Sequence, residues 1–309
     1  STAAPIDAGP ADAGSSLEVT QGPPPRMITA ELEKLFHKIS DIASFPAIAR
    51  KIINVASNDD ASVEDLLEVV EQDPVLSLKI LQTVNSAYYG LPNEVADLRT
   101  GVTLLGMKQV RNMALTVIVG RHYAMPSAVG YIDPTKMWDH SVCVAAAARV
   151  VAQKTGAADP DEAYLAGLIH DAGLLVIDQQ FEKELPRVLA HYKTNRCWMQ
   201  AEQEVLSFDH AQLGAYIAWR SGFPHRLVAA VDYHHCPTEA SDDVAPLSAV
   251  VSVANYLVSR LGRMAMQDRR LSPPLEVVFE RLQLDRRQVR TLWGELEAVL
   301  DTVGELKQL

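Results

Sequence analysis

Several features that mark common protein classes are scarce in this chain of 309 residues. It has three cysteines, Cys143, Cys197 and Cys236, which are widely spaced and form no C-x-x-C pair. This pattern predicts a reducing, cytoplasmic environment and not a disulfide framework. The sequence has no run of about 18 apolar residues, so no transmembrane helix is expected. Its N-terminus lacks a basic stretch followed by an apolar block, so it does not resemble a secretory signal.

Basic charge is also scarce. The chain has 28 Lys and Arg residues against 39 Asp and Glu residues, which gives a formal net charge of −11. Because contacts to phosphate groups need clustered Lys and Arg, this balance argues against a general nucleic-acid-binding protein, although it allows a local pocket for a nucleotide. Aromatic residues make up 6% of the chain and hydrophobic residues 48%. This composition favours a helical protein rich in Ala, Leu and Val.

Helix-start and helix-stop signals are frequent from residue 28 onward, whereas strand-like alternation is nearly missing. Ser62 begins a capping box, Asp73 caps a helix that Pro74 opens, and Gly106 separates two further helices. We therefore predict an all-α protein. Four apolar residues of the helix after Asp73 recur at helical spacing and are predicted to form its buried face: Val75, Leu78, Leu81 and Val84.

The pattern divides the chain into four parts. Residues 1–26 are mostly Ala, Gly, Pro, Ser and Asp, which predicts a disordered tail or linker. Residues 27–128 form an N-terminal helical subdomain, residues 129–265 a second helical core, and residues 266–309 the C-terminal helices. An apolar stripe in this last part either packs on the bundle or forms a homodimer seam. The stripe consists of Val289, Leu292, Leu296, Leu300 and Val303.

The second half carries a set of histidines and one aspartate that suits a divalent metal. The central pair, His170 and Asp171, is predicted to lie in the middle of an apolar helix, where burying both is costly unless a cation lies between them. Imidazole and carboxylate donors suit Fe, Mn, Zn or Mg, depending on geometry. The candidate ligands come from several helices, as in metal sites of helical bundles. They are His140, His170, Asp171, His210, His234 and His235.

Each of these candidates also has an ordinary structural interpretation. Asp171 could simply fix the tautomer of the His170 imidazole. His140 stands at the predicted start of an Ala-rich helix, and Asp209 would make His210 the first residue of a capped helix. The pair His234–His235 falls in the last turn of a helix, where histidine complements the helix dipole, and one ring is expected to face inward and the other the solvent.

The order His140, His170–Asp171 and a late polar residue in an apolar helix resembles the HD phosphohydrolase superfamily. The first half is more specific. The segment from Asp73–Pro74 to Asn85-Ser-Ala-Tyr-Tyr-Gly90, followed by the turn at Gly106, is similar to the HD-related output domain, HDOD. The resemblance covers about residues 36–260. It implies an HD-domain-like helical bundle with an N-terminal helical subdomain.

The resemblance also implies a bacterial cytoplasmic signalling role exerted through protein contacts. The implied partners are receiver-type or cyclic-dinucleotide signalling modules. His140, His170 and Asp171 match the ligands of the family's first metal, while His210, His234 and His235 match those of a second metal in the HD-GYP phosphodiesterase branch.

The chain departs from the active pattern at several positions. Asn255 stands where active members have an aspartate, and an amide is a weaker, neutral ligand. A lysine found after the central aspartate in the HD-GYP branch is missing from Ala172–Leu174. Cys236 replaces an acidic residue after the double histidine, and no G-Y-P triplet follows His210.

Three hypotheses follow. The first is a non-catalytic signalling output module with a degenerate metal site. The second is a metal-dependent phosphohydrolase or cyclic-dinucleotide phosphodiesterase, in which the metal would lower the pKa of a bound water to about 7. The third is a sensor that binds a nucleotide or a metal without turnover. The loss of the aspartate at Asn255 favours the first, and the number of retained histidines favours the second.

Overall fold

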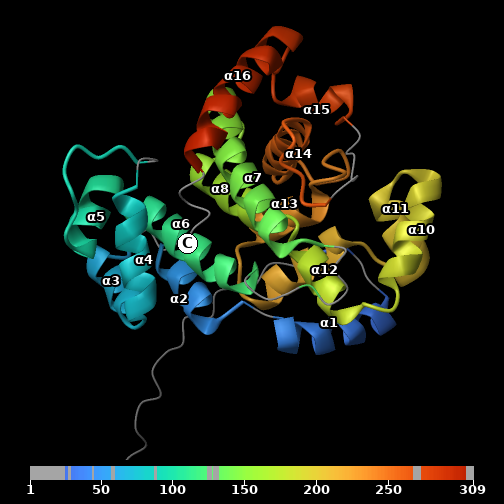
Figure 1. The fold of residues 1–309 in the computed structure, drawn as a ribbon, viewed down its shortest axis with the longest axis horizontal. Coiled ribbons are helices and arrows are strands. Elements are labelled where there is room, and N and C mark those ends of the chain that lie inside the picture. The colour runs from blue at the N-terminus through green and yellow to red at the C-terminus, as the bar shows by residue number, and fades with distance from the viewer. Residues whose placement is uncertain are drawn as a thin grey trace, which may run out of the picture.

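The computed structural model describes residues 25–26, 29–43, 45–56, 60–86, 89–123, 127, 132–266 and 273–303. Within these ranges all regular structure is helical and no strand occurs, which confirms the all-α prediction (Figure 1). The first helices are α1 (Ala30–Ala43), α2 (Ala47–Ala56), α3 (Val63–Glu71), α4 (Pro74–Val84), α5 (Leu98–Leu105) and α6 (Met107–Tyr123). Then follow α7 (Pro134–Thr155), α8 (Pro160–Ile169), α9 (Ala172–Gln180), α10 (Leu185–Asn195), α11 (Trp198–Leu206), α12 (His210–Arg220), α13 (His225–Tyr233), α14 (Ala245–Arg260), α15 (Glu276–Arg281) and α16 (Arg286–Thr302). None of these helices is both long and apolar enough to cross a membrane.

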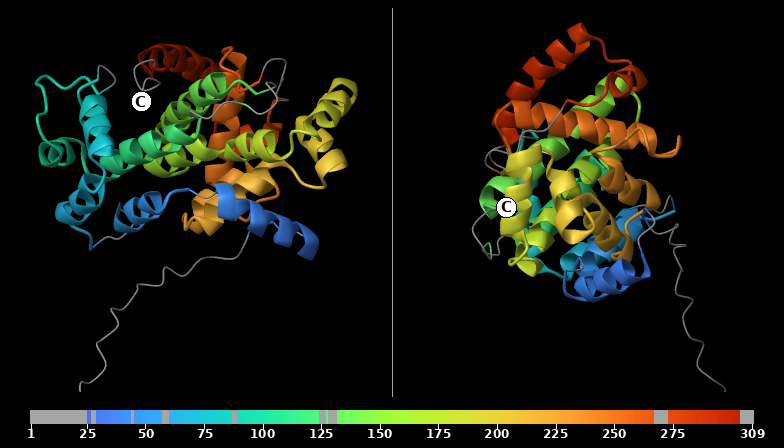
Figure 2. Two further views of the ribbon diagram at one scale, coloured as in Figure 1. Left: turned by 60° about the horizontal axis from the view of Figure 1, so that its bottom comes forward. Right: turned by 90° about the vertical axis from the view of Figure 1, so that its right-hand side faces the viewer.

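Helices α3, α4 and α5 form a lobe at one end of the molecule, and α6 runs from it to the rest of the bundle (Figures 1 and 2). The predicted caps are present. Ser62 accepts a hydrogen bond from the backbone N–H of Asp65 in a full capping box, and Asp73 caps α4 with Pro74 in its first turn. Gly106 ends α5 with a φ of 85°, a backbone conformation that glycine adopts without strain.

The predicted buried face of α4 is wrong at two of its four residues. Val84 is buried as predicted and Leu81 is half-buried, but the side chains of Val75 and Leu78 are 56% and 58% exposed, and the helix buries Leu76 and Ile80 in their place. Helix α4 is apolar on nearly every side, so the spacing of its hydrophobic residues cannot select one face. The contacts with α3 and α6 decide which residues are buried.

The Asn85 side chain closes the loop after α4. Its Nδ2 donates to the carbonyl oxygen of Val95 at 2.9 Å, and its Oδ1 accepts from the Val95 backbone N–H at 2.8 Å. An amide is the side chain that can do both at once, because it carries a donor and an acceptor side by side. Asn85 thus has a structural role within the segment that resembles HDOD.

The core of the molecule is the antiparallel pair α7 and α8, with α14 packed on α7. Small residues permit the close approach of the pair. A Cβ added to Gly167 of α8 would lie 2.9 Å from the Cα of Ala145 in α7. The C-terminal α16 lies along α7 and buries Leu292, Leu296 and Leu300. The stripe therefore packs on the bundle, which was one of its two predicted roles.

Helices α9, α12 and α13 complete this part of the bundle, and α1 crosses it against α12. Helices α10 and α11 pack on each other and project from one side (Figures 1 and 2). Residues 1–24 of the predicted tail lie outside the described residues. The ends of α8, α12 and α13 face the interior of the bundle, and the predicted site residues are found there.

Candidate metal centre

The pair His170–Asp171 lies at a break between two helices and not in the middle of one, as was expected. Helix α8 ends at Ile169, His170 is its C-cap, and Asp171 precedes the first residue of α9. On a continuous helix, neighbouring side chains point about 100° apart. The break lets both side chains enter the same interior site, and both residues are fully buried.

The carboxylate of Asp171 is surrounded by four imidazoles. Its Oδ2 lies 3.7 Å from Nε2 of His140 and 3.4 Å from Nε2 of His170. Its Oδ1 lies 3.2 Å from Nε2 of His210 and 3.5 Å from Nε2 of His234. One carboxylate thus lies between two pairs of histidines, with one oxygen facing each pair.

The second nitrogen of each of these rings is held by an acceptor. Nδ1 of His140 donates to the carbonyl oxygen of Arg263 at 2.6 Å, and those of His170 and His234 donate to carbonyl oxygens of their own helices at 2.7 and 2.6 Å. Nδ1 of His210 donates to a carboxylate oxygen of Glu202 at 2.6 Å. In a neutral imidazole only one nitrogen carries a hydrogen, so a ring that donates from Nδ1 offers the lone pair of its Nε2 on the side that faces Asp171.

A lone pair that faces a buried carboxylate is unfavourable unless a cation lies between them. Nε2 of His170 and of His234 are buried and have no hydrogen-bond partner among the described residues. Burial, as the largest cause, lowers the pKa of His234 to about 4, so this ring stays neutral at pH 7. Imidazole nitrogens fixed by an acceptor at Nδ1 and aimed at a shared carboxylate are a donor set that fits a divalent transition metal.

All six residues predicted as ligands come together. Donor atoms of Asp171, His210, His234 and His235 lie within 4.8 Å of one another, as do those of His140, His170 and Asp171. His140 lies in the second turn of α7, not at its start as expected, because this helix already begins at Pro134. That a metal binds to these residues stays a prediction.

His210, His234 and His235 lie at helix ends and are also among the candidate metal donors, so both of their predicted roles occur together. His210 is the first residue of α12, behind the Asp209 cap, and also faces Asp171. His234 is buried, whereas His235 is partly exposed but still directed inward, with its Nε2 3.1 Å from Nε2 of His210. The expectation that one ring of the pair would face the solvent is therefore only partly met.

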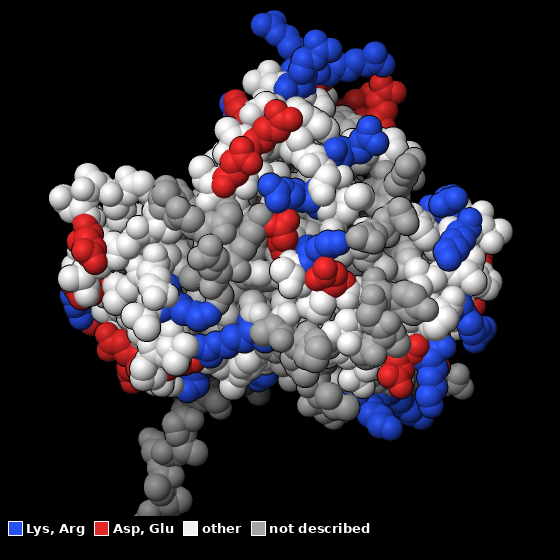
Figure 3. Space-filling view, viewed as in Figure 1, with Lys and Arg blue, Asp and Glu red and all other residues white. Residues whose placement is uncertain are grey.

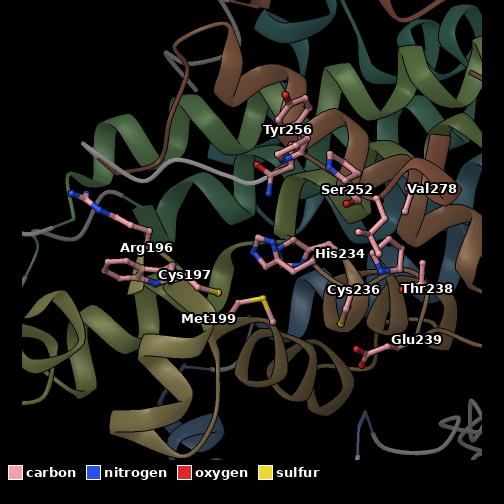
Figure 4. Close-up of a pocket in the computed structure, with 17 residues that line it drawn as sticks. Arg196, Cys197, Met199, His234, Cys236, Thr238, Glu239, Ser252, Tyr256 and Val278 are labelled. Carbon is pink, nitrogen blue, oxygen red and sulfur yellow. The ribbon is translucent and has the colours of Figure 1, made fainter. Parts of the chain in front are cut away.

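A cavity of about 350 Å³ opens beside His234 and His235. Asn255 of α14 and Trp198 of α11 contribute to its wall. Among the described residues that line it, Arg196 is the only arginine or lysine, and Figure 4 shows its side chain directed away from His234. The cavity thus offers access to the histidines but places no basic side chain next to them.

Glu202, which holds His210, was not predicted from the sequence. This carboxylate on α11 is fully buried; its Oε1 accepts from Trp198 Nε1 at 2.7 Å, and its Oε2 accepts from both the backbone N–H and Nδ1 of His210. A glutamate in a polar stretch of an amphipathic helix gives no sequence signal of such a role. Only its position eight residues before His210 could have suggested a contact.

Arg26 was missed as well, because it ends a segment that was predicted to be a disordered tail or linker. Its backbone N–H and Nε donate to the two carboxylate oxygens of Asp232 at 2.7 and 2.8 Å, and its Nη2 donates to the Asp232 carbonyl oxygen. The same Nη2 lies 3.7 Å from Asp209, and Nη1 donates to Cys236 Sγ at 3.6 Å. Arg26 thus joins the residues that flank His210 to those that flank His234.

The Cys236 thiol is not part of either group of donor atoms. Burial raises its pKa to about 12, so the neutral thiol is favoured. Cys236 is therefore a partly buried thiol and not a thiolate ligand.

Comparison with known protein families shows which family the chain belongs to. A model of the HDOD domain family matches residues 42–237. The chain belongs to this family.

The individual relatives and solved structures are distant in sequence. An uncharacterized protein from Treponema pallidum is 24% identical over 266 residues, which are 84% of this chain and 51% of that protein. The chain therefore spans about half the length of this curated relative. A crystal structure of an HDOD domain protein of unknown function from Geobacter sulfurreducens has a TM-score of 0.73 at 21% identity, covering 89% of this chain and 99% of that one.

Two further solved structures share the fold. A candidate phosphohydrolase from Shewanella amazonensis has a TM-score of 0.71 at 23% identity and covers 89% of this chain and 97% of its own. A candidate signal transduction protein from Marinobacter aquaeolei has a TM-score of 0.72 at 23% identity, with 90% of this chain and 65% of that chain covered. At this level of identity the likeness shows the fold alone.

Proposed function

We propose that this HDOD domain is a bacterial signal-transduction output module that holds a divalent metal in its core and acts through contacts with other proteins, without turnover. The observation that carries the proposal is the composition of the interior site. Enough donors to hold a metal come together there although Asn255 replaces the last carboxylate ligand, whereas the groups that would hold a phosphoryl oxygen in a reaction are missing among the described residues around it.

The metal would be held by Asp171 and the five histidines. A bound divalent ion supplies a positive charge that offsets the buried carboxylate and, in hydrolases, acidifies a bound water. Imidazole-rich sites favour Fe, Mn or Zn, whereas Mg²⁺ prefers oxygen donors and is the least suited of the four predicted metals.

Turnover is disfavoured by the residues around the metal donors. Asn255 is a neutral amide in the cavity wall, and Arg196 is directed away from His234 (Figure 4). Removing one polar contact that stabilises a transition state commonly raises the barrier by about 2.7–4 kcal/mol. With such contacts missing, the cavity supports binding better than catalysis.

Protein contacts are supported by the architecture around the core. The chain spans about half of its curated relative, which leaves room there for further modules. Figure 3 shows acidic and basic side chains interspersed on one face, with basic side chains at the tip of the molecule. Arg286, Arg287 and Arg290 of α16 are exposed. We place the protein in the cytoplasm and take receiver-type or cyclic-dinucleotide signalling modules as its partners.

A metal-dependent phosphohydrolase is the second candidate, and one observation favours it. His235 is partly exposed and, with His234, lines the cavity, so a ligand in the cavity could displace His235 or add to the metal as a fifth donor. Access of this kind is typical of catalytic rather than structural metal sites.

One experiment separates the two functions. The purified full chain is analysed for bound metals, reloaded with Mn²⁺ or Fe²⁺, and assayed with bis(p-nitrophenyl) phosphate and with a cyclic dinucleotide. We expect bound metal without hydrolysis of either compound. Hydrolysis that disappears in an Asp171→Asn variant would assign the chain to the phosphohydrolases instead.

A further inference from the structure

The six metal donors fall into two unequal halves that share Asp171. The His140 half contains His140, His170 and one oxygen of Asp171, and the His210 half contains His210, His234, His235 and the other oxygen. The first half offers three donors and the second four. Four donors complete the tetrahedral shell that zinc and similar ions adopt, whereas three leave it incomplete.

The surroundings of the two halves differ in charge. In the His140 half, both rings donate from Nδ1 to neutral carbonyl oxygens, of Arg263 and Gly167. In the His210 half, His210 donates to the Glu202 carboxylate, which brings a second buried negative charge next to the donors. A carboxylate behind a ligating histidine fixes its tautomer and makes the facing nitrogen a stronger donor.

The Glu202 contact is built into the fold. Its carboxylate is fully buried and accepts three hydrogen bonds, two of them from His210 and one from Trp198, so its position and that of the His210 ring are fixed together. Trp198 also lines the cavity beside His234. The side chains Trp198, Glu202 and His210 therefore form a continuous chain from the cavity wall to the metal donors.

We propose that the first metal ion occupies the His210 half, and that Glu202 is the positioning residue that gives this half the higher affinity. The inference rests on the proposed metal centre and says which of its two halves binds the first metal ion. It places the metal on the side of the cluster that borders the cavity, whereas the resemblance to HD hydrolases points to the half that contains His140.

The helix that carries Glu202 also provides a matched control. Glu204, two residues later, accepts from His191 Nδ1 at 2.7 Å, the same type of contact as that between Glu202 and His210. Glu204 and His191 are 41% and 45% exposed, and neither is among the metal donors. Glu202→Gln and Glu204→Gln thus remove the same charge from the same helix, once behind the metal donors and once away from them.

The test is a titration of the metal-free full chain with Co²⁺, followed by its visible absorption band and by Zn²⁺ competition. We expect Glu202→Gln to weaken binding of the first equivalent about 10–100-fold and to change the shape of the Co²⁺ band. Glu204→Gln should stay within about twofold of the unmodified chain, as expected for a surface substitution away from the site.

Two histidine variants locate the first metal independently of Glu202. His140→Ala should keep the first equivalent, and His235→Ala should lose it; His235 is partly exposed, so its removal leaves no closed cavity. The opposite result for this pair, or an unchanged first affinity in Glu202→Gln, would overturn the inference. If the unmodified chain takes up no metal at all, the proposed metal centre itself fails.

Discussion

Gly173 and the carbonyl oxygen of His210 approach each other so closely that a Cβ on residue 173 would lie 2.0 Å from that oxygen. Gly173 is in the first turn of α9, two residues after Asp171, and His210 begins α12. This contact sets the separation of the two helices that carry these donors. Gly173 also falls within Ala172–Leu174, the stretch that lacks the lysine of the HD-GYP branch.

We predict that Gly173→Ala lowers the free energy of unfolding by about 2–3 kcal/mol, because the backbone must shift to admit the methyl group. Urea denaturation measures this loss. Gly294→Ala in α16 is the control; a Cβ there meets nothing within 4 Å, and alanine should stabilise the helix by up to about 1 kcal/mol. Equal changes in the free energy of unfolding for the two substitutions would show that the close contact at Gly173 does not exclude a side chain.

Arg26 is predicted to stabilise the fold through two buried carboxylates. Asp232 and Asp209 have fully buried side chains, and Arg26 lies against both. Arg26→Ala leaves them without this cation, which should cost about 3 kcal/mol in thermal or urea denaturation. Arg99→Ala, which removes an exposed ion pair with Glu64, is the control and should change stability little.

Proteolysis tests the contact between Arg26 and Asp232 in a second way. Arg26 is the first lysine or arginine of the sequence, so trypsin cleavage after it releases residues 1–26 as a single fragment. We expect this cleavage to be slow while the guanidinium is bound to Asp232, and to become fast in Asp232→Asn. Rapid cleavage in the unmodified chain would contradict the observed contact.

The Asn85 contact with Val95 yields a third prediction. Asn85→Ala leaves the buried Val95 without its two hydrogen bonds to the Asn85 side chain and should destabilise the fold by about 2 kcal/mol. Asn93→Ala, an exposed position in the same loop, should stay within about 0.5 kcal/mol. The measurement is the free energy of unfolding from urea denaturation. A loss at residue 93 as large as that at residue 85 would assign the effect to the loop and not to the Asn85 amide.

The buried His234 predicts a pH dependence of the metal-free protein. Its pKa is about 4 in the folded chain and 6.5 as the ordinary value. Below pH 6.5 the unfolded chain takes up a proton that the folded chain does not, so stability is complete above about pH 6.5 and falls toward pH 4. The loss amounts to about 3 kcal/mol.

The control for this pH dependence is His234→Asn, which removes the titrating group. The stability difference between the two proteins should shrink as the pH falls from 6.5 to 4. A difference that stays constant over this window would show that His234 does not titrate as its burial requires.

Local sequence signals predicted much of the fold. The caps at Ser62 and Asp73 and the turn at Gly106 depend on backbone chemistry within a few residues, and all three are present. The exposed face of α4 was not predictable in this way. Val75 and Leu78 are as apolar as their buried neighbours, and only packing against α3 and α6 distinguishes them.

The candidate site was predictable in its residues but not in its geometry. The histidines and Asp171 stand out because such side chains are rarely buried without a partner. The helix break after Ile169 was not visible in the apolar sequence around it. Glu202 and Arg26 were missed because their roles depend on contacts with residues that are distant in sequence or lie on another helix.

The most direct test is elemental analysis of the folded full chain, before and after incubation with Mn²⁺, Fe²⁺ or Zn²⁺, beside Asp171→Asn and Glu204→Gln. We predict at least one divalent ion per chain, retained in Glu204→Gln and lost in Asp171→Asn, because Asp171 is the donor that both halves share. A folded chain that takes up none of these metals, or an Asp171→Asn variant that retains a full equivalent, would contradict the proposed metal centre.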